Sequence, residues 1–373
     1  MIDVLVAGGG PAGLATAIRC AQAGLEVTVA EPRAGPIDKA CGEGLMPAAV
    51  AGLDAIGVDL GGRQLRGIRY LDEQHQADGL FRRGPGLGVR RTELHAALSR
   101  RAKELGVGVV PVRVGGFVQE GGYVRAAGLT ARYLVAADGL HSAIRRECGL
   151  EVPAAGRRQY GTRYGARYGL RRHYRVAPWT SMVEVYWSAE AEAYVTPVAD
   201  DLVGVAILGE RAGGDGRAPG DGQADRDRGS GTALAGGSGF EARLAAFPAL
   251  LERLAGAEPA STVRGAGPLR QDVRHRVCER VLLVGDASGY IDALTGEGIS
   301  VALAQAAVLA SSLRDGRPGD YERAWRRVSR KSRLLTAGLL WSRHQPVLAR
   351  RIVPTAQRLP GLFTAIVNQV ADG

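Results

Sequence analysis

The chain has 373 residues, a formal net charge of +10 and four cysteines, and its length allows one large domain or two interleaved ones. The cysteines are scattered, and the basic residues form no helix-turn-helix, RRM or zinc-finger pattern. We therefore expect no disulfide framework, no metal site and no nucleic-acid partner. There is no basic leader pattern, and the longest late apolar run, Leu334–Trp341, is too short to span a bilayer, so we predict a cytoplasmic protein.

The start of the chain predicts a β-α-β unit that binds a dinucleotide. A β-branched strand, a glycine-rich turn, an alanine-rich helix ending at Gly24, and a second strand follow one another, over Ile2–Ala7, Gly8–Gly13, Leu14–Ala23 and Val27–Ala30. In such a unit the glycines allow a tight turn and a close approach of the backbone to the pyrophosphate, which lies at the helix N-terminus. An acidic residue after the second strand accepts hydrogen bonds from ribose hydroxyls. The expected cofactor-binding residues are Gly8, Gly10, Pro11, Ala12, Gly13 and Glu31.

The middle of the chain predicts an antiparallel sheet whose strands lie within residues 66–82 and 155–208. Between these two segments it predicts a helix over Arg91–Leu105. Residues 209–239 are rich in glycine, aspartate and arginine and predict a mobile loop, for which a lid over the site is the alternative interpretation. Helical spacing resumes over Phe240–Leu254. The strands are expected over Gly67–Leu71, Val183–Trp187, Ala193–Thr196 and Leu202–Leu208.

A second nucleotide-binding element is predicted far downstream. A buried strand begins at Arg280 and ends in a turn that presents Asp286, and Gly296-Glu-Gly298 then opens a long helix over Ile299–Leu313. A second helix N-terminus is a second site for polar or anionic groups. The first unit suits NAD and FAD equally, but only FAD extends far enough to need this second contact, so the sequence favours FAD.

The last segment, from Tyr321 onward, is predicted to be helical and interrupted by Pro346, Pro354 and Pro360. One face is apolar and the opposite face is rich in arginine. A packed helix with a solvated basic face is one interpretation, and a peripheral membrane contact that helps to collect an oily substrate is the other.

Five stretches of the chain resemble the FAD-dependent oxidoreductases of the p-hydroxybenzoate-hydroxylase fold, particularly the geranylgeranyl-reductase-like branch. The resemblance implies that a Cys-Gly loop and an arginine lie beside the flavin, that an Asp-Gly motif lies behind the pyrophosphate, and that a Gly-Asp motif binds the ribityl hydroxyls. It adds Cys41, Gly42, Arg91, Asp138, Gly285, Asp286, Gly296 and Gly298 to the cofactor-binding residues. The five stretches are Gly8–Gly13 with Glu31, Lys39–Pro47, Val89–Leu94, Val135–Arg145 and Gly285-Asp286.

The expected fold is therefore α/β, with a Rossmann-type FAD-binding domain interleaved with an antiparallel-sheet substrate domain, followed by C-terminal helices. The FAD-binding domain is predicted over residues 1–65, 89–150 and 265–315. The substrate domain is predicted over 66–88 and 151–264, and the C-terminal helical region over 316–373. The substrate pocket is expected between the sheet and the flavin.

Three residues are candidates for catalysis. Cys41 is interpreted either as a small side chain packed near the flavin ring or as a group that tunes the flavin or transfers a proton. Glu43 and Glu297 lie beside glycines in flavin loops, where a loop-fixing hydrogen-bond acceptor is the alternative to a general acid. His141 and His173 are interpreted as non-catalytic.

Three other residues are candidates for substrate binding. Tyr186 and Tyr194, with Trp187 beside them, alternate on the expected sheet and would stack on a planar substrate, although ordinary core packing is equally consistent with them. Asp292 is either a turn residue or a carboxylate in the pocket.

The resemblance implies an FAD-dependent monooxygenase that uses NAD(P)H and O₂ to hydroxylate a small lipophilic aromatic of the polyketide-phenol type. No second GxGxxG motif follows a strand, so NAD(P)H is expected as a transient visitor without a domain of its own. The motifs conflict about the chemistry, because Ser288–Asp292 resembles the reductase branch whereas that branch's Tyr-x-Trp-x-Phe-Pro segment is missing. Two alternatives stay open: an FAD-dependent reductase of isoprenoid or polyene double bonds, and a redox-neutral FAD protein that cyclises or carries a lipid.

Overall fold

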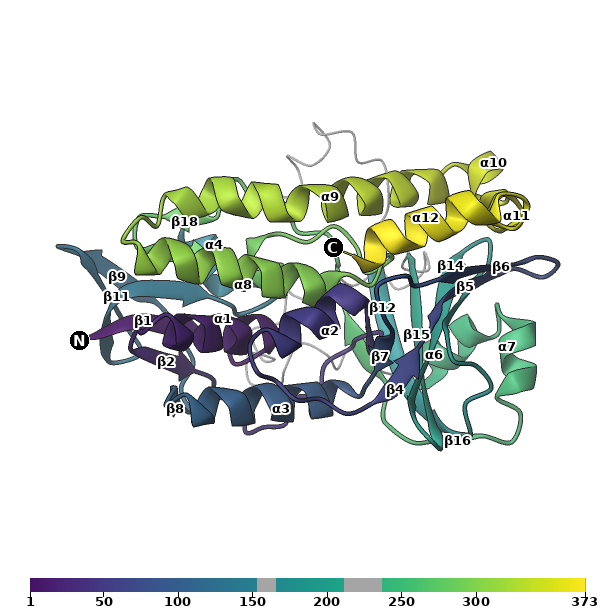
Figure 1. Ribbon diagram of the computed structural model, residues 1–373, viewed down its shortest axis with the longest axis horizontal. Coiled ribbons are helices and arrows are strands. Elements are labelled where there is room, and N and C mark those ends of the chain that lie inside the picture. Colours follow the sequence, from purple (N-terminus) through teal and green to yellow (C-terminus); the bar gives the residue numbers. More distant parts are fainter. Residues whose placement is uncertain (153–165, 211–236, 373) are drawn as a thin grey trace.

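Two β-sheets, side by side along the long axis, organise the protein in the computed structural model, which describes residues 1–152, 166–210 and 237–372 (Figure 1). The strands of the first sheet come from residues 2–30, 108–136 and 277–283, and those of the second from 67–80, 167–210 and 258–266. The chain therefore passes between the two sheets more than once, as the fold prediction requires. The mixed α/β architecture with C-terminal helices is confirmed.

The first sheet has a parallel centre, in the strand order β18-β19-β11-β1-β2-β8. Strands β1, β2, β8, β11 and β19 pair in parallel, and an antiparallel hairpin of β9 and β10 joins the sheet at β11. Parallel strands align their carboxyl ends at one edge, where ligands bind in open α/β sheets. The bounds are β1 Ile2–Ala7, β2 Val27–Ala30, β8 Gly108–Val110, β9 Phe117–Glu120, β10 Tyr123–Ala126, β11 Leu129–Ala136, β18 Val277–Cys278 and β19 Val281–Leu283.

Helices cover one face of this sheet, and β9, β10 and the short helix α4 cover the other. Helix α1 begins at Pro11, three residues earlier than expected, because Gly10 is its N-cap and proline suits the first helical position. Gly24, with φ +81°, ends it as predicted. Helix α9 packs on α8 above the sheet. The bounds are α1 Pro11–Gln22, α2 Pro47–Asp54, α3 Arg91–Glu104, α4 Ala143–Glu147, α8 Gly298–Arg314 and α9 Asp320–Arg343.

The second sheet has the order β16-β12-β15-β14-β13-β5-β6, with β17 also paired to β12. One pair, β5 with β13, is parallel, which corrects the prediction of a purely antiparallel sheet. The two strands lie more than a hundred residues apart in the chain, so no hairpin imposes an antiparallel orientation on them. The bounds are β5 Gly67–Leu71, β6 Gln76–Leu80, β12 Arg167–Arg175, β13 Val183–Trp187, β14 Ala191–Ala199, β15 Leu202–Glu210, β16 Glu258–Pro259 and β17 Arg264–Ala266.

Two separate helices cover the outer face of the second sheet, where one helix over Phe240–Leu254 was expected. These are α6 (Gly237–Leu244) and α7 (Pro248–Arg253), and the break falls where Pro248 cannot continue a helix but can start one. The predicted loop 209–239 lies largely outside the described residues. At its edges, residues 209–210 belong to β15 and residues 237–239 to α6.

A small third sheet lies between the two large ones, in the order β3-β7-β4. Its strands are β3 (Gly44–Leu45), β4 (Arg63–Leu65) and β7 (Gly86–Gly88). Thr196 on β14 of the second sheet donates a hydrogen bond to Gly42 O over 2.8 Å, just before β3. The loop before β3 is thereby held between the two halves.

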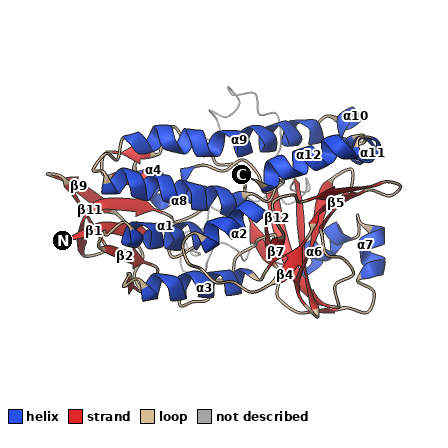
Figure 2. Ribbon diagram, in the orientation of Figure 1, coloured by secondary structure: helices blue, strands red, loops and turns tan. Residues whose placement is uncertain are grey.

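The C-terminal helices α9, α10 (Pro346–Ala349), α11 (Ile352–Arg358) and α12 (Pro360–Ala371) lie along the top of the view in Figure 2 and extend over β5 and β6. All three prolines fall in first turns, where the missing N–H has no helical partner to lose. Pro346 and Pro360 therefore begin new helices as predicted, whereas Pro354 lies inside the first turn of α11 and does not interrupt it. Among the described residues no helix is long and apolar enough to cross a membrane.

Candidate functional site

A cavity of about 810 Å³ lies between the two large sheets and below the C-terminal helices. It has two chemically different parts. The polar half contains the glycine turn of β1–α1 together with Lys39, Glu43, Arg91, Asp138, Arg171 and Asp286. The apolar half contains Val183, Val185, Leu294, Leu339, Leu348 and Phe363. Because both parts belong to one continuous space, a ligand in the polar half would lie directly against a ligand in the apolar half.

The glycine turn is built for a close approach of the chain to itself and to a ligand. A Cβ on Gly13 would lie 1.9 Å from Gly8 O, so only glycine lets helix α1 pack on the strand. Gly10 faces the cavity, and a Cβ there would meet only the Arg91 guanidinium, at 4.0 Å. The α1 N-terminus has no side-chain cap and no acidic residue in its first turn. Its free N–H groups are therefore available to an anion.

Glu31 lies at the end of β2 beside this turn. Its carboxylate accepts hydrogen bonds from Gly9 N at 2.9 Å and from Arg33 Nε at 2.8 Å. Burial alone would raise the pKa of Glu31, but the bonds from Arg33 and Gly9 hold it below its ordinary value. Arg33 lines the cavity, whereas Glu31 is not among the lining residues. Arg33, which the sequence did not single out, therefore faces the cavity and bonds Glu31, the residue predicted to bind the ribose hydroxyls.

Arg91 is a buried cation in the polar half. Its backbone N–H donates to Glu43 Oε1 over 2.8 Å, while its Nη1 has no hydrogen-bond partner in the described chain. Burial lowers its pKa, and Cys41 and Asp286 nearby oppose that effect. A buried guanidinium with an unused donor fits an anionic or carbonyl oxygen of a ligand.

Asp286 follows strand β19, and its neighbour Gly285 lies against the start of helix α1. Gly285, with φ +62°, approaches α1 so closely that a Cβ would lie 2.6 Å from the Ala12 Cβ. The Asp286 carboxylate faces the cavity. Its deep position raises its pKa, and Lys39 and Arg91 partly counteract this. The same burial lowers the pKa of Lys39, which also lines the cavity and was not singled out from the sequence.

Asp138 also lines the polar half. Its Oδ2 accepts from Ala143 N at 2.8 Å at the start of α4, and its buried Oδ1 has no hydrogen-bond partner among the described residues. A buried polar atom without a hydrogen-bond partner is unfavourable, and both Asp138 Oδ1 and Arg91 Nη1 are such atoms among the described residues. These orphaned atoms therefore fit a ligand that has both hydroxyl donors and phosphate acceptors.

The Cys41–Glu43 loop carries two of the three catalytic candidates, and both line the cavity. Burial raises the pKa of the Cys41 thiol, against the lowering effect of Arg91, which favours an uncharged thiol. Glu43 has φ +59°, so its backbone is strained, and its Oε2 lies 2.6 Å from His173 Nε2. Arg171 lies 3.1 Å from His173 Nδ1 and pairs with Asp38. The structure thus engages Glu43 in fixing this loop, through partners that sequence spacing did not reveal.

Glu297, the third catalytic candidate, is not among the residues that line the large cavity. It precedes α8, and its Oε2 accepts from Ser332 Oγ on α9 at 3.0 Å. Burial raises its pKa. The neighbouring Gly296 and Gly298 do line the cavity, so the backbone of this turn faces the site while the carboxylate points into the α8–α9 interface.

The two tyrosines predicted to bind substrate lie on opposite faces of the second sheet. Tyr194 lines the cavity, and its hydroxyl donates to Leu294 O over 2.8 Å. Tyr186 is not among the lining residues and packs in the apolar cluster under α6 and α7, where its hydroxyl bonds Glu184. Trp187 is buried against Tyr70. The placement of Tyr186 in the pocket is therefore corrected, because the outer face of this sheet is buried as well.

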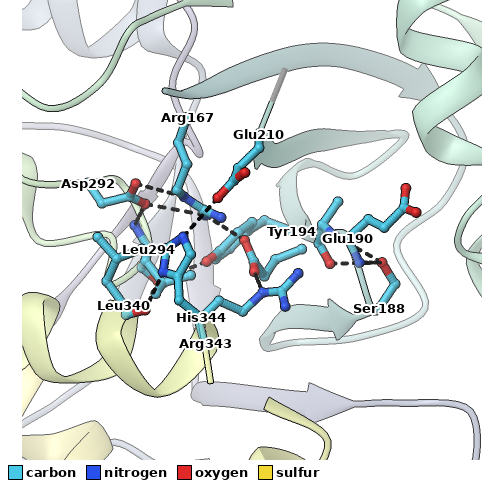
Figure 3. A network of polar contacts seen from close by, with 12 residues as sticks. Arg167, Ser188, Glu190, Tyr194, Glu210, Asp292, Leu294, Leu340, Arg343 and His344 are labelled. Carbon is cyan, nitrogen blue, oxygen red and sulfur yellow. Dashed lines mark hydrogen bonds and ion pairs between the residues drawn. The ribbon is translucent and has the colours of Figure 1, made fainter. Parts of the chain in front are cut away.

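Asp292, the third substrate-binding candidate, belongs to a buried ion network behind the cavity wall (Figure 3). Arg167 Nε donates to Asp292 Oδ2 at 2.9 Å, and Arg167 Nη2 donates to Glu192 Oε2 at 2.6 Å. Arg343 on α9 pairs with the second oxygen of Glu192. Asp292 is not among the residues that line the large cavity. The network joins β12, β14, α9 and the loop after β19, and none of its arginines was anticipated from sequence.

Taken together, the polar half supplies an uncapped helix N-terminus, a guanidinium nitrogen of Arg91 without a hydrogen-bond partner among the described residues, and two cavity-facing carboxylates, Asp138 and Asp286. This donor and acceptor set fits FAD, whose pyrophosphate needs the helix and cation and whose sugar hydroxyls need carboxylates. The comparison with protein families agrees, because residues 1–165 match the FAD binding domain family.

Relatives with assigned activities share part of the chain. A 6-methylpretetramide 4-monooxygenase of Streptomyces rimosus is 37% identical over 172 residues, which are 40% of this chain and 41% of that protein. A menaquinone reductase of Mycobacterium tuberculosis (strain ATCC 25618 / H37Rv) is 32% identical over 166 residues, 39% of this chain and 40% of the reductase. The matches thus span about two fifths of these relatives.

Solved structures share the whole fold at low sequence identity. A flavoprotein/dehydrogenase from Cytophaga hutchinsonii aligns with a TM-score of 0.80 and 20% identity, over 100% of this chain and 93% of that one. The halogenase PltM in complex with phloroglucinol and FAD aligns with a TM-score of 0.72 and 16% identity, over 98% of this chain and 82% of that one. The fold is therefore that of FAD-binding flavoproteins.

Proposed function

We propose, from the premise that this chain is a flavoprotein with an FAD-binding domain, that it is an FAD-dependent monooxygenase for a small lipophilic aromatic substrate. The overall reaction would convert a substrate C–H, O₂, NAD(P)H and a proton into a substrate C–OH, water and NAD(P)⁺. FAD, when bound, supplies the redox chemistry. The residues of this chain would bind and orient FAD and the substrate, and would exclude water from them.

The observation that carries the proposal is the direct continuity of the polar half with the apolar half of the cavity. The wall of the apolar half comes from β13 through Val183 and Val185 and from the C-terminal helices through Leu339 and Phe363. Burying a hydrophobic ligand there is favourable in proportion to the apolar area that leaves water. A polyketide phenol or similar aromatic matches this lining.

The titratable groups of the apolar half also fit a reaction driven by the cofactor. Burial raises the pKa of Tyr194 well above its ordinary value, and the pKa of Tyr70 is raised in the same way. Both phenols therefore stay neutral near pH 7 and act as hydrogen-bonding or packing groups. In a hydrolase, by contrast, the substrate-binding part of the cavity would be expected to hold a pair of carboxylates, or a histidine beside a nucleophile.

The polar half would hold FAD through roles that follow from the geometry. The α1 N-terminus and Gly10 would take the pyrophosphate, and Asp286 would accept hydrogen bonds from sugar-chain hydroxyls. Arg91 and the Cys41 loop would lie at the ring end, where Cys41 is kept as an uncharged thiol. Glu43 would fix the loop through His173 rather than act as a general acid.

A second candidate function is the reduction of a quinone or an isoprenoid double bond. It is favoured by the menaquinone reductases among the relatives. The apolar half suits either kind of substrate. The identity to the polyketide monooxygenase over a segment of similar length favours hydroxylation as the first hypothesis.

The two candidates are separated by the fate of oxygen. The purified FAD-loaded protein is mixed with NADPH or NADH and with polyketide phenols or isoprenoid quinones, and oxygen consumption, hydrogen peroxide and product mass are followed. A product that gains one oxygen atom in step with NAD(P)H oxidation supports the monooxygenase. A product that gains hydrogen without oxygen consumption supports the reductase. A substrate that changes without any NAD(P)H oxidation contradicts both and assigns a redox-neutral role.

A further inference from the structure

The C-terminal helices expose apolar side chains on their outer face, where a helix in contact with water normally carries polar side chains. On α9, Leu334 is 63% exposed and Trp341 is 52% exposed. Ala337 and Gly338 between them are exposed as well, so one apolar stripe follows the spacing i, i+3, i+4 and i+7. Helix α9 therefore has an outer apolar face that no described residue covers.

The stripe continues onto the short helices that follow. Val347 on α10 is 66% exposed, and Leu348, Leu359, Leu362 and Ile366 are exposed too. These helices gather at the C-terminal end of α9, at the same end of the molecule as β5 and β6 (Figure 1). We define the C-terminal apolar surface as these residues together with those of α9: Leu334, Trp341, Val347, Leu348, Leu359, Leu362 and Ile366.

The C-terminal apolar surface borders the opening of the cavity. Leu348, Leu359, Leu362 and Ile366 line the cavity and are also exposed to solvent. A side chain with both properties lies where the cavity meets the outside. Arg351 and Thr355 also line the cavity and are exposed, so the opening has an apolar border with a basic side chain beside it, and a hydrophobic ligand could pass along the apolar border into the apolar half.

Basic residues predominate in the chain segment that carries this surface, with Glu210 of β15 as an acidic contact of His344. Between Glu322 and Asp372 the sequence contains no aspartate or glutamate, but it contains ten lysines and arginines. Several of the arginines in this segment are exposed, including Arg350, which follows α10, and Arg358 at the end of α11. The ten basic residues are Arg323, Arg326, Arg327, Arg330, Lys331, Arg333, Arg343, Arg350, Arg351 and Arg358.

We propose that the C-terminal apolar surface docks this protein on a bilayer that contains anionic lipids, with the cavity opening toward the membrane. Apolar side chains enter the boundary between headgroups and acyl chains, and basic side chains contact the anionic headgroups. The contact is peripheral, because no helix of the described chain could span a bilayer. A second copy of the chain is a less suitable occupant, since a two-fold contact would bring two positively charged faces together.

The inference does not depend on the proposed reaction, because it is tested by binding alone. The FAD-loaded protein is sedimented with vesicles of phosphatidylcholine, with or without phosphatidylglycerol. We expect co-sedimentation with the anionic vesicles, at least about tenfold weaker binding to the neutral ones, and weakening by salt.

Two variants divide the apolar from the electrostatic contribution. The triple variant Leu334→Gln, Trp341→Gln, Val347→Gln changes exposed residues that do not line the cavity, and we expect it to abolish co-sedimentation. The double variant Arg350→Gln, Arg358→Gln is expected to bind anionic vesicles about tenfold more weakly, since each basic residue near the surface contributes.

A matched control carries Val109→Gln, Val118→Gln and Leu251→Gln, which are exposed apolar residues on β8, β9 and α7. It should bind vesicles like the unchanged protein, and bound flavin and thermal stability verify that each variant is folded. Two results would overturn the proposal: no difference between vesicles of the two compositions, or a dimer in size-exclusion chromatography that the triple variant converts to a monomer while no vesicle binds.

Discussion

The polar and apolar halves of the cavity are specified in different ways. The polar half is made by short chain segments in which glycines and charged residues stand at fixed spacings, and a few of its buried polar atoms have no hydrogen-bond partner among the described residues. The apolar half is made by side chains from strands and helices far apart in the chain, and it depends on how those elements pack. The contrast indicates that cofactor binding tolerates little change in single residues, whereas substrate choice is adjustable through packing.

The largest effect is expected in the polar half. In Gly13→Ala the new Cβ would lie 1.9 Å from Gly8 O, so helix α1 must move away from the strand. We expect the protein to purify without flavin and to lose about 3 kcal/mol of unfolding free energy. Flavin absorbance and urea unfolding measure both changes. Gly61→Ala, where a Cβ meets open space, is the control and should behave like the unchanged chain.

The ion network behind the apolar half gives the next largest effect. Glu192→Gln removes the carboxylate between Arg167 and Arg343 and leaves two buried cations with less compensation. Breaking a buried pair in this way costs about 3–5 kcal/mol of unfolding free energy. We expect urea unfolding to report that loss while the variant still binds flavin. If Glu192→Gln lost its flavin while its unfolding free energy stayed unchanged, the network would support the polar half rather than the apolar half.

Asp286→Asn is expected to weaken FAD binding by about tenfold, since a hydrogen bond to a charged group is stronger than one to a neutral group. Burial raises the pKa of Asp286 in the flavin-free folded state above its ordinary value of 3.8. The carboxyl therefore stabilises the fold below that value and loses this contribution as the pH rises through the raised pKa.

Flavin-free Asp286→Asn should consequently have a higher Tm than the flavin-free unchanged protein near neutral pH. The difference in Tm should shrink as the pH falls toward 3.8, because the Asp286 carboxyl of the unchanged protein is then protonated and neutral, like the asparagine amide. Calorimetry across this range, with flavin titrations at neutral pH, measures the two effects. Equal Tm values at every pH would contradict the assigned role of burial.

The smallest effects are expected from a pair of tyrosines that distinguishes the two faces of the second sheet. Tyr194→Phe and Tyr186→Phe each remove one buried hydrogen bond and should each lower the unfolding free energy by about 1 kcal/mol. Only Tyr194→Phe should change KM for the substrate, because Tyr194 lines the cavity and Tyr186 does not. A KM change in Tyr186→Phe alone would reverse this assignment.

The same contrast explains what could be predicted from the sequence. Strand β2 has the predicted bounds, and the direct approach of Gly285 to Ala12 brings together two motifs from opposite ends of the chain. Local spacing was sufficient there, because glycine geometry and helix termini act over a few residues.

Local spacing was not sufficient for the apolar half and its supports. Both faces of the second sheet are buried, so alternation could not decide that Tyr194 faces the cavity and Tyr186 faces α6 and α7. The pairing of Arg167 with Asp292, and of Glu43 with His173, joins residues more than a hundred positions apart. Such pairs are fixed by tertiary packing, and a single sequence carries no signal for them.

Every role proposed for the polar half requires FAD to bind at the β1–α1 turn and at Asp286. The most direct measurement is the flavin content of the natively purified protein, followed by titration of any flavin-free fraction with FAD. We predict a yellow protein that releases FAD on denaturation, and a flavin-free fraction that regains the bound-flavin spectrum. A folded, colourless protein that takes up no added FAD would contradict the account.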